Sequence, residues 1–196
     1  MPTTQIQIDP EGDVLIILPV DKPGVKPKLS NSPGSPTVKH FLCSKKHLTL
    51  ASPRAAKIFS SSFKEASKQD DGFHHWIFEA IFDAEAFELV LRIIHGKTRE
   101  IPQVIELDVL AAIASITDDL QCHDALYYFS HRWMSSFHGV FGSRLPEAMN
   151  KTLAQFILIS FVFEHVRLFQ DSTKTAIRFS DGVIPTFELP IRADIL

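Results

Sequence analysis

The stretch from Phe41 to Phe63 constrains the fold of this chain more than any other part of its sequence. It begins as a short apolar strand, continues into a helix that starts at Ser44, and breaks at Ser52-Pro53 before a second helix. A serine caps the first turn of a helix well, and a proline fits the first helical position. A strand that leads directly into two short helices predicts a mixed fold of the α+β class.

Strands are expected on both sides of this stretch. Residues 5–8 alternate polar and apolar side chains, residues 9–12 have turn chemistry, and residues 13–20 are mostly apolar, so this segment predicts a β-hairpin. Further strands are expected at residues 37–43 and 75–78. Residues 21–36 are rich in Pro, Gly, Ser and Lys, a composition that buries too little apolar surface to become ordered. We therefore expect a mobile insert there.

Helices are expected over most of the second half of the chain. Asp83 precedes an amphipathic segment that ends at Gly96, and residues 107–120 are apolar on more than one side, which indicates a central helix. The next helix has an apolar stripe formed by Leu126, Phe129, Trp133 and Phe137. Two more helices, over residues 147–163 and 164–178, are expected after a loop that contains Gly139, Gly142 and Pro146. In the short helix after Ser44, two side chains are expected to point inward, Leu48 and Leu50.

The charge of the chain argues against nucleic acid as a partner. Its 196 residues carry a net charge of −3, whereas nucleic-acid binding usually needs a basic face. The longest apolar run, residues 156–163, is shorter than the ~20 residues that span a bilayer, and no secretory leader opens the sequence. The two cysteines lie in apolar segments, which is typical of buried thiols. We therefore expect an intracellular protein, in the nucleus or the cytoplasm, that binds neither nucleic acid nor membrane.

The sequence offers little that indicates catalysis. Ser61 and Lys64 have the Ser-x-x-Lys spacing of some hydrolases, but the companion motifs of those enzymes are missing. Structural zinc sites use ligands paired at C-x₂₋₄-C or H-x₃₋₅-H spacing. Here Cys122 and His123 are adjacent, and His131 lies two helical turns further on. We therefore expect a protein that is not an enzyme and that holds no cofactor and no metal.

The order of the expected elements resembles the core of the BTB/POZ domain, a fold that binds other proteins. Three local motifs carry the resemblance. Gly12-Asp13-Val14 is similar to the opening of the first core strand, residues 41–52 are similar to the strand and helix that follow, and residues 121–123 resemble the break between paired core helices. The phrase LRIIHGKTREIP, residues 91–102, looks like the single-domain BTB proteins common in fungi. The resemblance implies a BTB/POZ domain over residues 1–137, with the insert at 21–36, and a C-terminal helical extension and tail over residues 138–196.

The resemblance also implies where partners bind. BTB proteins that recruit cullin ubiquitin ligases carry a hydrophobic-x-Glu element just after the second helix, and Phe63 and Glu65 fall at the positions of that element. Transcription-repressor members have a charged pair that lines a groove, and Asp13 and Lys45 are the matching residues here. In this chain a serine precedes Lys45, where the family often has histidine.

We therefore expect a non-enzymatic protein–protein interaction module of the BTB/POZ type. An adaptor that recruits a cullin ubiquitin ligase is the first alternative, and a hydrolase is the second. Self-association is left open. BTB dimers that exchange N-terminal segments use a helix and a strand before the core, and only about a dozen residues precede Asp13 here. A monomer or a different dimer is the expectation.

Overall fold

The computed structural model describes residues 4–20, 38–60, 62–140, 145–180 and 182–191. Its fold is α+β, as predicted: within these ranges, a four-stranded sheet is combined with seven α-helices. The chain divides into two compact units, Met1–Ile101 with Leu120–Cys122, and Pro102–Asp119 with His123–Leu196. The family resemblance implies a different boundary, between residues 137 and 138, and that boundary stays a prediction.

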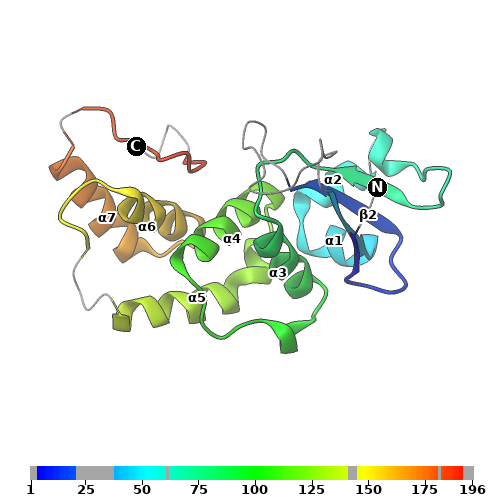
Figure 1. Ribbon diagram of the computed structural model, residues 1–196, viewed down its shortest axis with the longest axis horizontal. Coiled ribbons are helices and arrows are strands. Elements are labelled where there is room, and N and C mark those ends of the chain that lie inside the picture. Colours follow the sequence, from blue (N-terminus) through cyan, green and yellow to red (C-terminus); the bar gives the residue numbers. More distant parts are fainter. Residues whose placement is uncertain (1–3, 21–37, 61, 141–144, 181, 192–196) are drawn as a thin grey trace, which may run out of the picture. The chain divides into compact units, whose positions relative to one another are not determined.

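The first unit contains the sheet, with strand order β1-β3-β2-β4 (Figure 1). Its strands are β1 (Thr4–Gln7), β2 (Val14–Pro19), β3 (Val38–Cys43) and β4 (His74–Ile77). The central strand β2 runs antiparallel to β3, with Ile16 opposite Phe41, and parallel to β4, with Ile16 opposite Trp76. Most of β2 is buried, because its near-continuous apolar run suits a strand with neighbours on both edges.

The predicted hairpin between residues 5–8 and 13–20 is wrong. The first strand pairs with β3 instead of β2, in parallel, with Ile6 opposite Phe41. At the end of β1 the backbone N–H groups of Ile8 and Asp9 both donate to the carbonyl of Leu42, at 3.0 Å each. The turn at residues 9–12 therefore carries the chain from one edge of β3 to the other. The alternation of polar and apolar residues predicts a strand, but it does not predict which strand is its neighbour.

The hairpin of this sheet is formed by the two strands that flank the Pro-rich segment. The register of β2 and β3 runs from Val14 opposite Cys43 to Pro19 opposite Val38. The mobile insert that the sequence predicts at 21–36 lies outside the described residues. The strands on both sides of it nevertheless belong to one sheet.

The helices of the first unit begin where their capping residues predict. They are α1 (Lys45–Ala51), α2 (Pro53–Ser60) and α3 (Ala84–Ile94), with the 3₁₀ helices η1 (Lys64–Ala66) and η2 (Thr98–Glu100). Ser52 caps α2, since its hydroxyl accepts the Ala55 N–H at 2.9 Å. Asp83 caps α3, since its carboxylate accepts N–H bonds at 3.0 and 2.8 Å. The helix η1 lies between α2 and β4.

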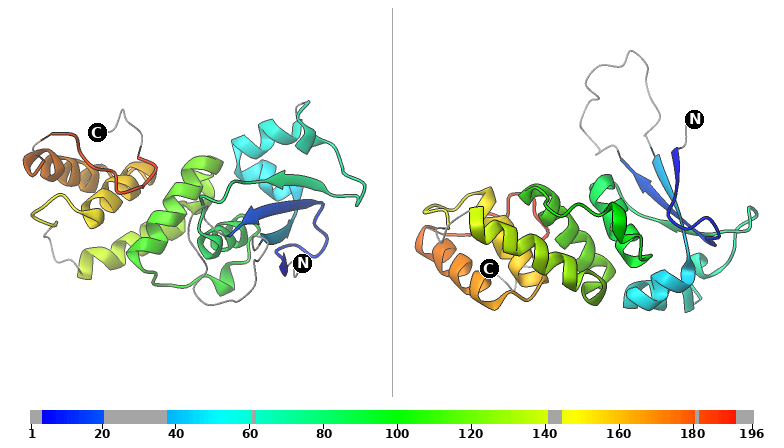
Figure 2. Two further views of the ribbon diagram at one scale, coloured as in Figure 1. Left: turned by 45° about the horizontal axis from the view of Figure 1, so that its top comes forward. Right: turned by 90° about the horizontal axis from the view of Figure 1, so that it is seen from below.

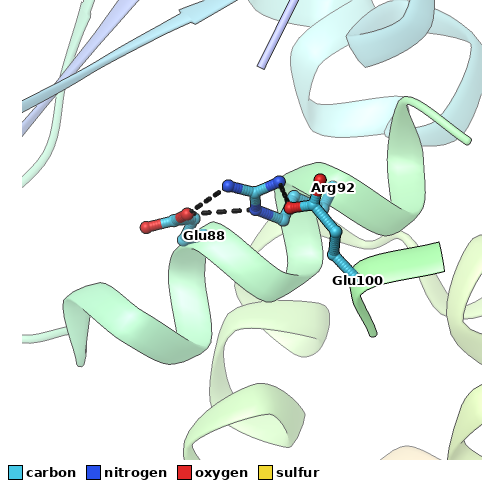
Figure 3. Close-up of polar contacts among 3 residues, drawn as sticks. All are labelled: Glu88, Arg92 and Glu100. Atoms are coloured by element: carbon cyan, nitrogen blue, oxygen red, sulfur yellow. Dashed lines mark hydrogen bonds and ion pairs between the residues drawn. The ribbon is translucent and has the colours of Figure 1, made fainter. Parts of the chain in front are cut away.

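The end of α3 is tied to the segment that follows it. The Arg92 guanidinium donates to the Glu88 carboxylate one turn earlier, at 2.8 and 3.0 Å, and to the carboxylate of Glu100 in η2 (Figure 3). Between these elements Gly96 adopts a φ of 70°, the left-handed conformation that glycine tolerates at a helix end. The ion pairs hold the segment from residue 95 to 101 against α3.

The second unit is helical in its described part. It contains most of α4 (Leu107–Leu120), together with α5 (His123–Val140), α6 (Lys151–Val162) and α7 (Val166–Arg178). The last two helices lie side by side (Figure 2) and share a small core of Leu153, Ile157 and Ala176. The bounds of α4 agree with the prediction, whereas Gly139 belongs to α5 and not to a loop. No helix in the described ranges has the length and apolar character that crossing a membrane requires.

Candidate functional site

Asp13 and Lys45, the first pair of predicted site residues, do lie together. The contact joins the Asp13 carboxylate to the backbone N–H of Lys45, at 2.7 Å, at the start of α1. Ser44 occupies the cap position, but its side chain makes no capping hydrogen bond, so the predicted role of its hydroxyl is wrong. Asp13 takes that role from a distant part of the sequence. A carboxylate at this end is favoured, because it satisfies an unpaired N–H and the positive end of the helix dipole.

The ammonium group of Lys45 lies over an aromatic ring. Its Nζ is 5.5 Å from the ring centroid of Phe59, at the end of α2, a geometry in which the cation is attracted to the ring face. The Phe59 ring also meets Trp76 edge-on, with centroids 5.5 Å apart. Lys45 is therefore held at the boundary between the charged start of α1 and the aromatic core under α2.

Phe63 and Glu65, the second pair, lie directly after α2. The Phe63 side chain is 51% exposed and precedes η1, in which Glu65 is half-buried. The backbone carbonyl of Glu65 is bound to Nδ1 of His74 in β4, at 3.1 Å. This bond fixes η1 to the edge of the sheet, so Phe63 is presented next to a short helix that is anchored at one end.

His95 is a structural centre of the first unit that the sequence did not indicate. Its Nε2 accepts the backbone N–H of Ser44 at 3.0 Å, and its Nδ1 lies 2.8 Å from the carbonyl of Leu91. A carbonyl only accepts hydrogen bonds, so Nδ1 carries the proton and the ring is neutral. Burial lowers the pKa of His95, and the nearby His47 ring, 5.1 Å away between centroids, adds to that effect. His95 thus joins the end of α3 to the start of α1.

The first unit also exposes apolar side chains that its core does not use. The prediction that Leu50 points inward is wrong: it is 85% exposed, whereas Leu48 is buried. In a helix as short as α1, the buried face holds a single residue, and Leu50 lies far from it around the helix. Ile77 in the edge strand β4 and Ile81 after it are exposed as well. Exposed apolar side chains of this size mark surfaces where other molecules can be bound.

In the second unit, one groove combines aromatic and basic side chains. Its volume is about 510 Å³, and it lies between residues 103–104 and the outward face of α5. We call it the tyrosine groove; its lining includes Val104, Tyr127, Tyr128, His131 and Arg132. The apolar stripe that the sequence predicts lies on another side of α5, so these residues were not predicted. The signal available in the sequence was the pair of adjacent tyrosines, Tyr127 and Tyr128, which are not part of that stripe.

The thiols of the chain are not exposed to reagents. Cys43 and Cys122 are both buried and form no disulfide, as the sequence predicts. Burial raises the pKa of the Cys43 thiol far above its ordinary value, and the charge of Asp9 raises it further. A reactive cysteine needs a lowered pKa and some exposure, so Cys43 is suited to packing. In the part of the chain that the structure describes, no three His, Cys, Asp or Glu side chains are grouped to hold a metal ion.

Comparison with known proteins does not assign the chain to a family. No family model matches the sequence, and no curated protein matches it. The α+β fold class is therefore a property of the structure alone. The BTB/POZ resemblance stays a prediction that depends on the local motifs and on the order of the elements.

Proposed function

We propose that this protein is a non-enzymatic protein–protein interaction module of the BTB/POZ type that acts inside the cell. The observation that carries the proposal is the exposure of large apolar side chains around the sheet unit, above all Leu50 and Phe63. Leu50 lies near the end of α1 and Phe63 lies three residues after the end of α2, so both belong to the helical pair that follows β3 and its exit. The polar groups nearby are committed to the scaffold, since Asp13 caps α1 and both ring nitrogens of His95 hold helix ends.

The order of the elements supports the BTB/POZ type. An antiparallel pair, β2 and β3, is followed by α1 and α2, by a strand that returns to the sheet beside β2, and then by α3, α4 and α5. The order on which the resemblance depends begins with a hairpin over residues 5–20, and that hairpin is wrong. The later part of the order, from β3 through the paired helices and β4 to the further helices, supports the proposal. Because a fold alone does not define a function, the proposal is tested by measuring whether the chain binds a partner protein.

The experiment compares partner capture by the tagged full chain and by matched surface variants. Leu50→Ser and Phe63→Ser remove exposed apolar groups of the first unit, and Val183→Ser removes one from the second unit, where Val183 is 98% exposed. We expect the same partner to be captured by the wild type and by Val183→Ser, and to be lost from the other two variants. Equal capture by all four chains, or capture of nothing by the wild type, would refute the proposal. Light scattering on the pure chain decides between a monomer and a self-associating module.

A cullin adaptor is the second candidate, and the position of Phe63 favours it. The side chain is half exposed directly after α2 and two residues before Glu65, where the hydrophobic-x-Glu element is expected. With purified cullin as bait, Phe63→Ala and Glu65→Ala should each abolish capture. Ile81→Ala, which truncates another exposed apolar side chain of the same unit, serves as the control. If the wild type does not bind the cullin, the adaptor role is excluded while the general interaction module is still testable by the capture experiment above.

A further inference from the structure

The tyrosine groove exposes more aromatic surface than the packing of α5 explains. Tyr127 and Tyr128 are each 66% exposed and Val104 is 70% exposed, whereas Leu126 and Trp133 on the other side of the helix are buried. A helix that already buries one complete face has no structural need for two tyrosines on the face opposite. Tyrosine and arginine are also the residue types that contribute most to binding at protein interfaces.

Both walls of the groove are held in place. On the buried side, the indole Nε1 of Trp133 donates to the carbonyl of Pro102 at 2.9 Å. On the exposed side, the Arg132 guanidinium donates to the side-chain Oε1 of Gln103, also at 2.9 Å. These two bonds fix the segment before α4 to consecutive residues of α5. A groove that is formed before binding loses little conformational entropy when it is filled.

The floor of the groove is ordered by contacts along α5. The rings of Tyr127 and His131, one turn apart, have centroids 4.4 Å apart. The hydroxyl of Ser135 donates to the His131 carbonyl at 2.7 Å, and that of Ser136 donates to the Trp133 carbonyl at 2.6 Å. Since these hydrogens are used within the helix, the two serines present acceptor lone pairs to the groove. A bound peptide N–H can donate to them.

The groove carries a permanent positive charge. That charge is the guanidinium of Arg132, and among the residues that the structure describes no aspartate or glutamate lines the groove. An arginine has five N–H donors, and the bond to Gln103 uses one of them, so a carboxylate can be bound by two others. A single permanent cation is too few to follow a nucleic-acid backbone, whose binding depends on several phosphate contacts.

We propose that the tyrosine groove binds an acidic segment of a partner protein, with an apolar side chain of that segment seated among Val104, Tyr127 and Tyr128 and a neighbouring carboxylate on Arg132. Because the tyrosines are so exposed, the site suits a peptide laid across the surface better than an enclosed small molecule. The inference depends on the proposed function as an interaction module, but it concerns residues of the second unit and uses neither Phe63 nor Leu50, which belong to the first.

The test measures binding of synthetic peptides to the full chain by fluorescence anisotropy. The probe is a short labelled peptide in which aspartate alternates with leucine and phenylalanine. Three unlabelled competitors replace its aspartates by asparagine, its aspartates by lysine, or its apolar residues by serine. We expect the aspartate peptide to bind saturably and the three others to compete weakly, because each lacks either the charge or the apolar anchor.

Variants assign the binding to the groove. Tyr128→Ala should weaken the aspartate peptide about tenfold or more, as truncation of an aromatic anchor does. Arg132→Gln should bring the affinity of the aspartate peptide down to that of the asparagine peptide, a loss of discrimination that a general loss of structure does not mimic. Val183→Ser should leave the affinity unchanged. Thermal unfolding of every variant confirms that the exposed substitutions leave the fold intact.

Several outcomes would overturn the proposal. They are the absence of saturable binding by the aspartate peptide, equal binding of the lysine peptide, an unchanged affinity in Tyr128→Ala, and displacement of the peptide by a single-stranded oligonucleotide that binds more tightly. A failure of this kind leaves the broader function standing if the capture experiment on Leu50→Ser and Phe63→Ser still shows a lost partner. If the peptide binds the groove but the capture experiment shows no lost partner, the binding surface lies on the second unit and not on the first.

Discussion

Replacing His95 by glutamine tests how the start of α1 is held to the end of α3. The neutral ring accepts the Ser44 N–H at Nε2 and donates to the Leu91 carbonyl at Nδ1. Protonation of Nε2 would place its hydrogen against the Ser44 N–H, so the charged ring cannot keep this bond. Glutamine carries an oxygen at about the distance of Nε2 and does not titrate. We therefore expect His95→Gln to keep the acceptor for Ser44 and to remove the dependence on pH.

The sign of the effect follows from the lowered pKa of His95. Burial is the main cause and the charge of His47 on α1 adds to it, while the hydrogen bond to Leu91 and the carboxylate of Asp9 oppose them. The unfolded chain therefore binds this proton more readily than the folded one. The stability that His95 contributes is complete above its unfolded pKa of about 6.5 and is lost as the pH falls toward the folded pKa. Within that window the free energy of unfolding falls by at most ~1.4 kcal/mol per pH unit. At higher pH, His95→Gln loses only the bond to Leu91, about 1 kcal/mol.

The assay is urea unfolding of the full chain and of His95→Gln between pH 5 and pH 7.5, followed by circular dichroism. His40, whose pKa is lowered by burial and by His75, contributes to the slope of both proteins, so the difference between them isolates His95. His95→Ala adds a control that leaves the Ser44 N–H without its acceptor. It should cost about 1–3 kcal/mol relative to the wild type above about pH 6.5, and less as the pH falls, because the protonated wild-type ring loses the same bond. Parallel pH profiles for the wild type and His95→Gln would show that the ring nitrogens do not hold the two helices together.

Three further substitutions test contacts that position the proposed surfaces. Asp13→Ala removes the cap from the Lys45 N–H and should lower the free energy of unfolding by about 0.5–2 kcal/mol, whereas Asp13→Asn, which keeps an oxygen acceptor, should lose less; equal losses would contradict the capping role. Gly12→Ala places a Cβ 2.6 Å from the backbone oxygen of Cys43, and we expect a loss of about 1–3 kcal/mol, since backbone has to move; a melting temperature like that of the wild type would show that the turn relaxes freely. Trp133→Phe keeps a buried ring but removes the indole bond to the segment before α4, and should cost about 0.5–1.5 kcal/mol and weaken the aspartate peptide; unchanged peptide affinity would mean that this bond does not shape the groove.

Local features of the fold could be predicted because their causes lie within a few residues. Asp83 caps α3 through N–H groups two and three residues further on, and Ser52 caps α2 in the same way. The bounds of α4 agree with the prediction, because an apolar pattern of that length admits few other structures. The two candidate pairs of site residues were placed by family resemblance. The structure brings Asp13 and Lys45 into contact, but whether either pair binds a partner stays a prediction.

Other features depend on neighbours that are far away in the sequence. Residues 5–8 alternate as a hairpin strand does, yet β1 pairs with β3 in parallel and not with β2. Leu50 was assigned to the core on its hydrophobicity, but α1 has room for one buried side chain, and Leu48 fills it. The carboxylate that caps α1 comes from residue 13, so no pattern around Ser44 reveals it.

What the sequence alone determined is the α+β class, the positions of most helices and strands, and the two buried cysteines, because turn chemistry, capping and apolar periodicity act over a single turn or strand. Only the tertiary structure decided the partner of β1, the use of Asp13 and His95 to hold helix ends, and the formation of the tyrosine groove. Each of these joins segments that are separated along the chain, and such contacts depend on which surfaces remain available once the sheet and helices have packed.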